Sequence, residues 1–157
     1  MTNQESFFLT GLTDKKILLA EDSMINQEIA CEFLKDVNIE LYIAENGQQA
    51  FDMFNQYPEK YALILMDVCM PILNGYEATQ KIRALDAGKN IPIIAMTANS
   101  AQKDIDQALA TGMNDYITKP IDANAPHKKI TFWIKNPKQN TTEKNWKDNT
   151  TKVIQKH

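Results

Sequence analysis

The stretch ALILMD, residues 62–67, places five apolar residues directly before an aspartate. An apolar run of this length is typical of a strand that is buried on both faces of a sheet. Similar short runs recur along the chain at residues 16–20, 41–44, 91–96 and 115–118. Apolar residues at helical spacing follow each of these runs. The sequence therefore alternates strand and helix patterns.

This alternation predicts an α/β fold with a doubly wound, five-stranded parallel sheet that is covered by helices on both faces. Pro126 is tolerated only in the opening turn of a helix, so we expect the last helix to start near Asn124 or Ala125. We expect three parts in the chain: an N-terminal extension (1–12), the folded domain (13–136) and a polar linker or tail (137–157).

Composition excludes several classes of function. The formal net charge of -3 over 157 residues gives no general electrostatic attraction to nucleic acid or to anionic lipid, and no apolar run is long enough to span a membrane. We therefore expect neither contact from this chain. Cys31 and Cys69 lie far apart and form no metal-binding pair, which favours reduced thiols in a soluble cytoplasmic protein.

Polar residues stand at the ends of four predicted strands. These are Glu21, Asp22, Asp67, Thr97 and Lys119. The carboxyl ends of parallel strands meet at one edge of the sheet, where ligand sites of such folds lie. Three carboxylates gathered there repel one another unless a hard cation neutralises them, and Mg²⁺ with its oxygen ligands fits that requirement.

Asp67 at this edge could serve as a nucleophile and form an acyl phosphate. Catalysis of such a step is mainly positioning and stabilisation of charge, which Mg²⁺, Lys119 and Thr97 could supply. Each residue alone would be taken for a solvated acid, a helix-capping hydroxyl or a surface lysine. Their joint placement at successive strand ends favours a functional site.

Four segments now give a more specific indication: ILLAEDSMINQ, LILMDVCMPILNGYEA, IIAMTANS and GMNDYITKPID. In letters and in spacing they resemble the receiver domains of two-component response regulators and hybrid histidine kinases, most closely those of the hybrid sensor kinases. The resemblance spans roughly residues 13 to 136. It implies a flavodoxin-like sheet with strand order 2-1-3-4-5 and five helices.

The resemblance also implies the role of each site residue. Asp67 would accept a phosphoryl group from a phosphohistidine, on a histidine kinase core or a histidine phosphotransfer domain. Mg²⁺ would be bound by Glu21, Asp22, Asp67 and the backbone carbonyl of Cys69. The domain would catalyse only its own phosphorylation and dephosphorylation, while the parent chain would be a sensor histidine kinase.

A conformational switch belongs to the same resemblance. Lys119 would pair with the phosphoryl group, Thr97 would donate its hydroxyl to it, and Tyr116 would follow the movement of Thr97. The face formed by the fourth helix, the fifth strand and the fifth helix would then change and act as the output surface.

Residues around the site have scaffold interpretations. Pro71 stiffens the loop after the third strand, and Gly75 is expected to permit an unusual backbone angle where the third helix begins. Pro126 and His127 stand where the family usually carries core-facing aliphatic residues, which leaves the packing of the last helix open.

Several alternatives remain open. An aspartate-nucleophile phosphatase on a similar fold needs a second aspartate where this chain has Cys69. Flavodoxin-like cofactor binding would need glycines in place of the acidic loop that contains Glu21 and Asp22. A degenerate receiver conflicts with the intact site. The chain is either a module of a hybrid kinase, then at the cytoplasmic face of the inner membrane if that kinase is membrane-bound, or a stand-alone single-domain regulator.

Overall fold

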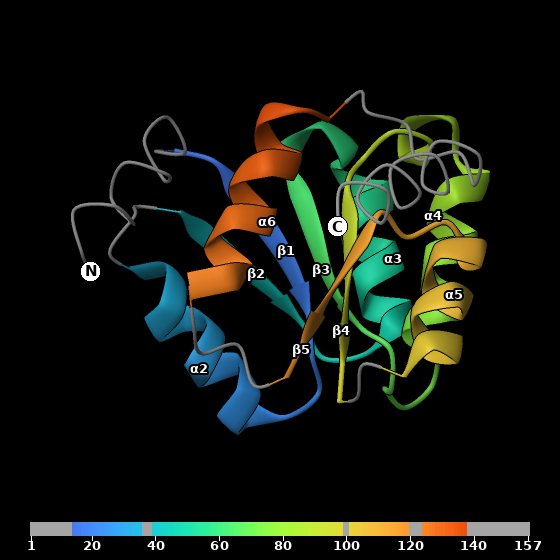
Figure 1. The fold of residues 1–157 in the computed structure, drawn as a ribbon. Coiled ribbons are helices and arrows are strands. Elements are labelled where there is room, and N and C mark those ends of the chain that lie inside the picture. Colours follow the sequence, from blue (N-terminus) through green and yellow to red (C-terminus); the bar gives the residue numbers. More distant parts are fainter. Residues whose placement is uncertain (1–13, 36–38, 99–100, 120–123, 138–157) are drawn as a thin grey trace.

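The computed structural model describes residues 14–35, 39–98, 101–119 and 124–137. Five parallel strands form one sheet in the order β2-β1-β3-β4-β5, which confirms the predicted architecture (Figure 1). The strands are β1 (Lys16–Ala20), β2 (Glu40–Ala44), β3 (Leu63–Asp67), β4 (Ile93–Thr97) and β5 (Asp115–Thr118). Asp67 and Thr97 were predicted to follow their strands. They are instead the last residues of β3 and β4 and still pair with the neighbouring strand.

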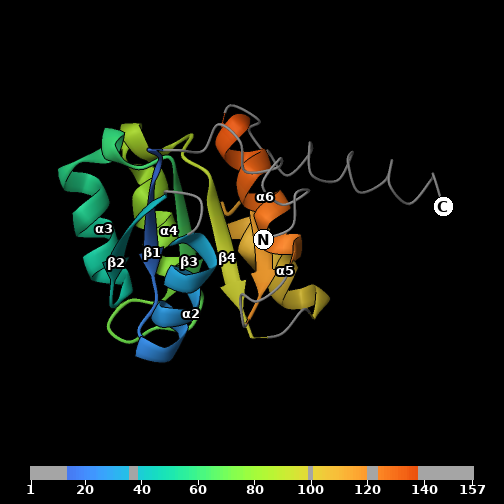
Figure 2. The same ribbon diagram turned by 90° about the vertical axis from the view of Figure 1, so that its left-hand side faces the viewer.

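Helices cover both faces of the sheet. They are α2 (Met24–Leu34), α3 (Gly47–Gln56), α4 (Gly75–Ala84), α5 (Gln102–Thr111) and α6 (Asn124–Lys135), with short 3-10 turns η2 (Pro58–Lys60) and η3 (Asp86–Gly88). Helices α2 and α6 pack on one face, while α3, α4 and α5 pack on the other (Figures 1 and 2). Helix α6 begins at Asn124, as its proline predicted. Among the described residues, no helix has both the length and the apolar character needed to cross a bilayer.

The two faces of the sheet enclose two apolar cores. Leu19 and Leu65 point into the core under α2 and α6, which contribute Leu34 and Ile130. The opposite core contains Phe54 of α3 and Ile82 of α4. The alternation of side chains along each strand separates these two sets of residues. The central strands are buried on both faces, so their carboxyl ends are rigid positions for functional groups.

Local capping starts two helices directly beside the predicted site. Ser23, the residue after Asp22, caps α2: its hydroxyl accepts a hydrogen bond from the Asn26 backbone N–H, and the helix begins at Met24. Asn74 and Glu77 form a reciprocal capping box at the start of α4. Each cap satisfies backbone N–H groups that a helix leaves free at its first turn. The chain therefore turns sharply from each strand end into a helix and leaves the strand-end side chains at the edge.

The loop between β3 and α4 departs from one prediction. Gly75 does not adopt an unusual backbone angle; among the described non-glycine residues, Ile72 does so in this loop, with φ of 70°. A Cβ on Gly75 would instead lie 2.2 Å from the Asp67 carbonyl oxygen. Glycine is thus required because the start of α4 passes directly over the end of β3.

The last helix packs through the residues that departed from the family pattern. Pro126 and His127 are both buried, and the His127 ring stacks on Phe33 of α2 with centroids 3.8 Å apart and an interplanar angle of 12°. An aromatic stack therefore occupies the α2–α6 contact where the family pattern has aliphatic side chains. Cys31 and Cys69 are exposed free thiols.

At the other end of the sheet, a partly buried arginine joins several segments. The Arg83 guanidinium donates to the carbonyls of Gly112 (2.9 Å), Gly88 (2.7 Å) and Ile91 (2.7 Å), and to the Asn114 side chain (2.8 Å). Burial lowers the pKa of Arg83 to about 10, which leaves it charged at neutral pH. The side chain fixes α4 to the end of α5 and to the segments that enter β4 and β5.

Candidate functional site

Three acidic side chains meet at the carboxyl edge of the sheet. Glu21 and Asp67 are 1% and 2% exposed, whereas Asp22 faces solvent. One carboxylate oxygen from each residue lies within 4.8 Å of the other two. A buried pair of acids with a third at its mouth is a set of hard oxygen donors, and this set suits Mg²⁺. The structure thus brings together the acids that the strand ends predicted.

Lys119 supplies the positive charge in this cluster. Its Nζ lies 2.9 Å from Glu21 Oε1 and 2.9 Å from Asp67 Oδ2. The lysine backbone N–H donates to the Thr97 carbonyl at 2.8 Å, which ties the turn after β5 to the end of β4. One ammonium group therefore forms ion pairs with both buried carboxylates.

Burial and mutual contact shift the pKa values of these three groups. Burial and the hydrogen bond with Glu21 raise the pKa of Asp67 to about 7, against the opposing effect of Lys119. Burial also acts to raise the pKa of Glu21, but the hydrogen bonds with Asp67 and Lys119 outweigh it and lower the net value. Burial acts to lower the pKa of Lys119, and contact with the two acids reverses this and raises it. Of the two buried acids, Asp67 is therefore the one that retains a proton up to near neutral pH.

Backbone groups orient the two buried acids. The Cys69 N–H donates to Asp67 Oδ1 at 3.1 Å, and the Ser23 N–H donates to Glu21 Oε2 at 3.2 Å. The Gln27 side-chain amide donates to the Glu21 carbonyl at 2.7 Å. Sequence reasoning did not identify Ser23 or Gln27, although a serine that caps the helix beside an acidic strand end was a usable signal. These contacts fix the orientation of both buried acids.

Thr97 and Tyr116 lie on the same face of the sheet. Ala95 of β4 pairs with Tyr116 of β5, and Thr97 lies two residues beyond Ala95 on the same strand. Side chains two residues apart point to the same face, so Thr97 and Tyr116 are diagonal neighbours. Thr97 is 7% exposed at the site, while Tyr116 is half-buried and borders the core under α3, α4 and α5. The structure thus places the two predicted switch residues next to each other.

The sequence did not identify the contacts of Tyr116 with α6. Lys129 Nζ lies 3.9 Å from the centroid of the Tyr116 ring and donates to the Tyr116 carbonyl at 2.6 Å. The same ammonium pairs with Asp115 Oδ1 at 3.3 Å. Lys129 stands four residues before Trp133, which puts both on one side of α6, but their meeting with β5 required the tertiary structure.

Exposed apolar side chains stand in the segments that follow the acidic strand ends. Met24 and Ile25 in the first turn of α2 are 73% and 70% exposed, and Ile72 in the loop after β3 is 79% exposed. All three follow closely after an acidic strand end. Large apolar side chains with this exposure at the rim of a site mark a surface that another molecule can cover.

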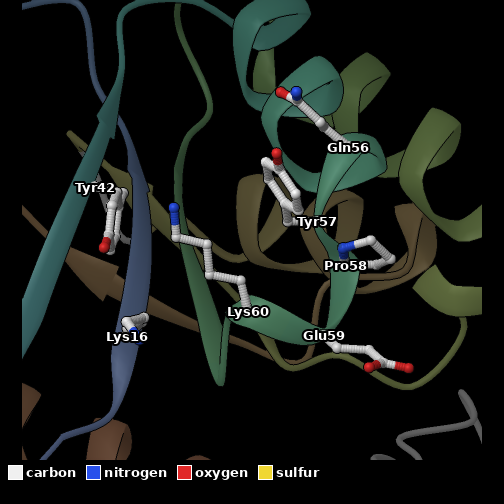
Figure 3. Close-up of a pocket in the computed structure, with 7 residues that line it drawn as sticks. All are labelled: Lys16, Tyr42, Gln56, Tyr57, Pro58, Glu59 and Lys60. Atoms are coloured by element: carbon white, nitrogen blue, oxygen red, sulfur yellow. The ribbon is translucent and has the colours of Figure 1, made fainter.

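A separate pocket lies toward the amino end of β1, away from the acidic cluster. It has a volume of about 690 Å³ and is lined by residues from β1, β2, the end of α3 and η2 (Figure 3). Lys60 Nζ lies 3.8 Å from the centroid of the Tyr42 ring and 5.7 Å from that of Tyr57. None of the predicted site residues lines this pocket, so the pocket is separate from the acidic cluster.

Comparison with known proteins gives a consistent family assignment. The family model for the response regulator receiver domain matches residues 17–131. The hybrid signal transduction histidine kinase I of Dictyostelium discoideum is 42% identical over 113 residues, which is 69% of this chain and 6% of that protein. Two further curated relatives are covered over 16% and 27% of their length, so the chain spans only a small part of the proteins it matches.

Solved structures show the same fold. The receiver domain of the sensor histidine kinase PA1611 from Pseudomonas aeruginosa PAO1, which has magnesium in its active site cleft, is 38% identical with a TM-score of 0.70 over 78% of this chain and 99% of that chain. A second match comes from a co-crystal structure of the Saccharomyces cerevisiae histidine phosphotransfer protein Ypd1 and the receiver domain of its downstream response regulator Ssk1. The identity is 34% and the TM-score 0.73, over 82% of this chain and 94% of that chain.

Proposed function

The chain belongs to the response regulator receiver domain family, and from this premise we propose that Asp67 accepts a phosphoryl group from a phosphohistidine of a partner protein. The observation that carries the proposal is the geometry of Asp67. Its carboxylate is 2% exposed at the end of β3, it is held by the Cys69 N–H, and it lies 2.9 Å from the Lys119 ammonium. A nucleophile needs this kind of fixed position beside a charge that can stabilise the product.

In the proposed transfer, a P–O bond to Asp67 forms as the P–N bond to the donor histidine breaks. A carboxylate oxygen of Asp67 attacks phosphorus, the P–N bond to the donor imidazole breaks, and the imidazole retains the electron pair of that bond. Asp67 must be ionised when it attacks, because only the carboxylate is nucleophilic, so its proton passes to solvent beforehand, and the departing imidazole takes up a proton from solvent. Lys119 already touches the acceptor and can keep its ammonium beside the new phosphoryl oxygens.

We propose that Glu21, Asp22, Asp67 and the backbone carbonyl of Cys69 bind Mg²⁺. The fit rests on the donor set: three carboxylates whose oxygens lie within 4.8 Å of one another, with Asp22 open to solvent. When bound, the ion would neutralise charge on the transferred phosphoryl group and favour the ionised state of Asp67. The magnesium in the active site cleft of the PA1611 receiver domain supports this assignment.

The phosphoryl donor is proposed to be a histidine kinase core or a histidine phosphotransfer domain. The exposed side chains of Met24, Ile25 and Ile72, in the segments that follow the acidic ends of β1 and β3, offer such a partner an apolar surface. The Ypd1–Ssk1 co-crystal supports a phosphotransfer partner for a receiver of this type.

The context of the domain is also a proposal. The similarity to a hybrid histidine kinase supports a module of such a kinase, and the phosphorelay would then run within the cytoplasm. A stand-alone regulator is the second candidate. An aspartate-nucleophile phosphatase is disfavoured because the position of its second aspartate carries Cys69 in this chain.

The output of phosphorylation is proposed to be a change in the face formed by α5, β5 and α6. Charge added at Asp67 would draw the Thr97 hydroxyl inward, and its neighbour Tyr116 could occupy the space that Thr97 leaves. The shared sheet face of these two residues supports the coupling. Tyr116 lies in β5 between α5 and α6, so its movement would alter their relative packing.

Acetyl phosphate and Mg²⁺ provide a direct test. We expect the purified protein to gain one phosphoryl group, detected as an added mass that hydroxylamine removes. Asp67→Asn should abolish the adduct, whereas Asp86→Asn, which changes an exposed aspartate in η3, should leave it unchanged. An adduct that survives Asp67→Asn would refute the assignment.

A further inference from the structure

Lys129 of α6 makes three contacts with two consecutive residues of β5. Its Nζ pairs with Asp115 Oδ1 (3.3 Å), donates to the Tyr116 carbonyl (2.6 Å) and lies 3.9 Å from the centroid of the Tyr116 ring. A single ammonium group therefore holds both the backbone and the ring of Tyr116. The contact with the ring is a cation–π interaction, which depends on where the ring lies.

Asp115 extends this unit into the core. Its Oδ2 accepts a hydrogen bond from the indole N–H of Trp133 at 3.0 Å, and its Oδ1 also accepts from the Tyr116 N–H at 2.8 Å. Trp133 is only 5% exposed and belongs to the core that α2 and α6 form on the sheet. The network of Lys129, Asp115, Tyr116 and Trp133 thus joins the edge strand to α6.

From this geometry we propose that Lys129 is a positioning residue that holds Tyr116 in its resting place and so opposes the phosphorylation switch. This inference rests on the proposed function, in which Tyr116 moves toward the space left by Thr97. If the ring moves toward β4 while Lys129 keeps its contacts with Asp115 and the Tyr116 carbonyl, the contact between the ammonium and the ring is lost. Lys129 of α6 would therefore set how readily the switch operates.

Thermodynamic linkage predicts how this restraint affects the affinity for a phosphoryl mimic. A contact made only in the resting state lowers the affinity of the domain for any ligand that favours the switched state. Loss of the contact must raise the affinity for a phosphoryl mimic at Asp67 by the same factor, although Lys129 is not part of the acidic cluster. A cation–π contact at a half-exposed position corresponds to a factor of about three to ten.

A purely structural ion pair would behave differently. The side chains of Lys129 and Asp115 are 32% and 25% exposed, so their pairing could simply stabilise the docking of α6. Removal would then lower the stability of resting and switched states alike and leave ligand affinity unchanged. The affinity of the mimic therefore separates a positioning role from a structural one.

The test titrates beryllofluoride, a phosphoryl mimic, in the presence of Mg²⁺. The readout is the fluorescence of Trp133, made unique by Trp146→Phe in every variant, because only two tryptophans occur in the sequence. Nuclear magnetic resonance of the Trp133 indole N–H provides a second readout of the Asp115 contact. The variants are Lys129→Met, which keeps the side-chain length but removes the charge, and Lys129→Arg, which restores a cation over the ring. Lys135→Met, an exposed lysine on the same helix, is the matched control.

We expect Lys129→Met to bind beryllofluoride about three- to tenfold more tightly than the parent, with Lys129→Arg and Lys135→Met close to the parent. Equal affinity in Lys129→Met and the parent, with beryllofluoride bound in both, would overturn the inference and leave the proposed function intact. If the parent itself binds no beryllofluoride, the proposed function fails and this inference fails with it. Should Lys129→Met fold poorly, Asp115→Asn, which retains an acceptor for Trp133, is expected to give the same direction of change.

Discussion

Lys119 and Asp67 form an ion pair of 2.9 Å between side chains that are 19% and 2% exposed. The ammonium also contacts Glu21, so it neutralises part of an acidic cluster that would otherwise be strongly unfavourable. The domain thus keeps the proposed acceptor paired with the cation that phosphoryl oxygens would need. In the proposed transfer, Lys119 would change partners over a short distance and would not be recruited from solvent.

Removal of this cation should destabilise the fold. With Lys119→Met we expect the free energy of unfolding without Mg²⁺ to fall by about 1–3 kcal/mol above neutral pH, because two buried carboxylates lose their counter-charge. Urea unfolding of Lys119→Met and of the exposed-lysine control Lys89→Met measures the difference. Equal losses in both variants would show that the buried pair contributes no net stability.

The raised pKa of Asp67 gives a pH dependence of stability. The folded-state pKa of about 7 lies above the ordinary value of 3.8, so the folded protein holds this proton more tightly than the unfolded chain does. The contribution of Asp67 to stability is therefore complete at low pH and is lost as the pH rises through about 7. In Mg²⁺-free buffer, the gain in unfolding free energy from Asp67→Asn should grow between about pH 4 and pH 7. Urea unfolding at several pH values tests this, and a gain independent of pH would contradict the assignment.

Mg²⁺ should stabilise the folded domain through its acidic cluster. A ligand that binds only the folded state at 100 times its dissociation constant adds about 2.7 kcal/mol to the free energy of unfolding. We expect thermal unfolding to shift upward with Mg²⁺ and to return to its starting temperature with a chelator. Glu21→Gln should reduce the shift strongly, while Glu28→Gln, an exposed glutamate of α2, should not alter it. The same shift in both variants would place the ion elsewhere.

Gly75 should not tolerate a side chain. A Cβ at this position would lie 2.2 Å from the Asp67 carbonyl oxygen, and backbone on both sides prevents relief of the clash. We expect Gly75→Ala to lower the unfolding free energy by more than about 2 kcal/mol, and to weaken Mg²⁺ binding because the end of β3 must shift. Asn74→Ala, which removes only the helix cap, should lower stability by about 1 kcal/mol with little effect on Mg²⁺. Calorimetry with and without Mg²⁺ distinguishes these results.

Arg83 should contribute to stability without contributing to the site. Arg83→Met would remove the arginine donor of three carbonyl groups and one of the two donors to Asn114 Oδ1, which keeps the Ile93 N–H; we expect a loss of about 3 kcal/mol or more. Lys89→Met, an exposed residue nearby in sequence, should change stability by less than about 0.5 kcal/mol. Mg²⁺ affinity of the folded Arg83→Met protein, measured by titration, should remain close to that of the parent. A parallel loss of affinity would show that the two ends of the sheet are not independent.

The sequence predicted those features that depend on one segment at a time. The apolar run at residues 62–66 and the acid after it located β3 and Asp67 within one residue. Because parallel strands end at a common edge, the residues after each run could be brought together without coordinates. The role of Gly75 was misread, since the close pass of α4 over β3 is a contact between segments.

Contacts across the fold carried no comparable sequence signal. The Arg83 network joins residues from five parts of the chain, and the meeting of Lys129 with Tyr116 depends on how α6 crosses the sheet. His127 replaces an aliphatic residue, and only the position of Phe33 shows that a ring stack can fill that space. Periodicity identifies which residues face inward, but it does not identify their partners.

The Arg83 network gives the molecule a fixed end. Its guanidinium fastens α4, the end of α5 and the entries to β4 and β5 at the edge of the sheet opposite Asp67. A displacement that starts beside the proposed acceptor would therefore be smallest at this anchored edge and largest near the carboxyl ends of the strands. A partner that senses phosphorylation would then find the largest change in the half of α5 and α6 that lies farthest from Arg83.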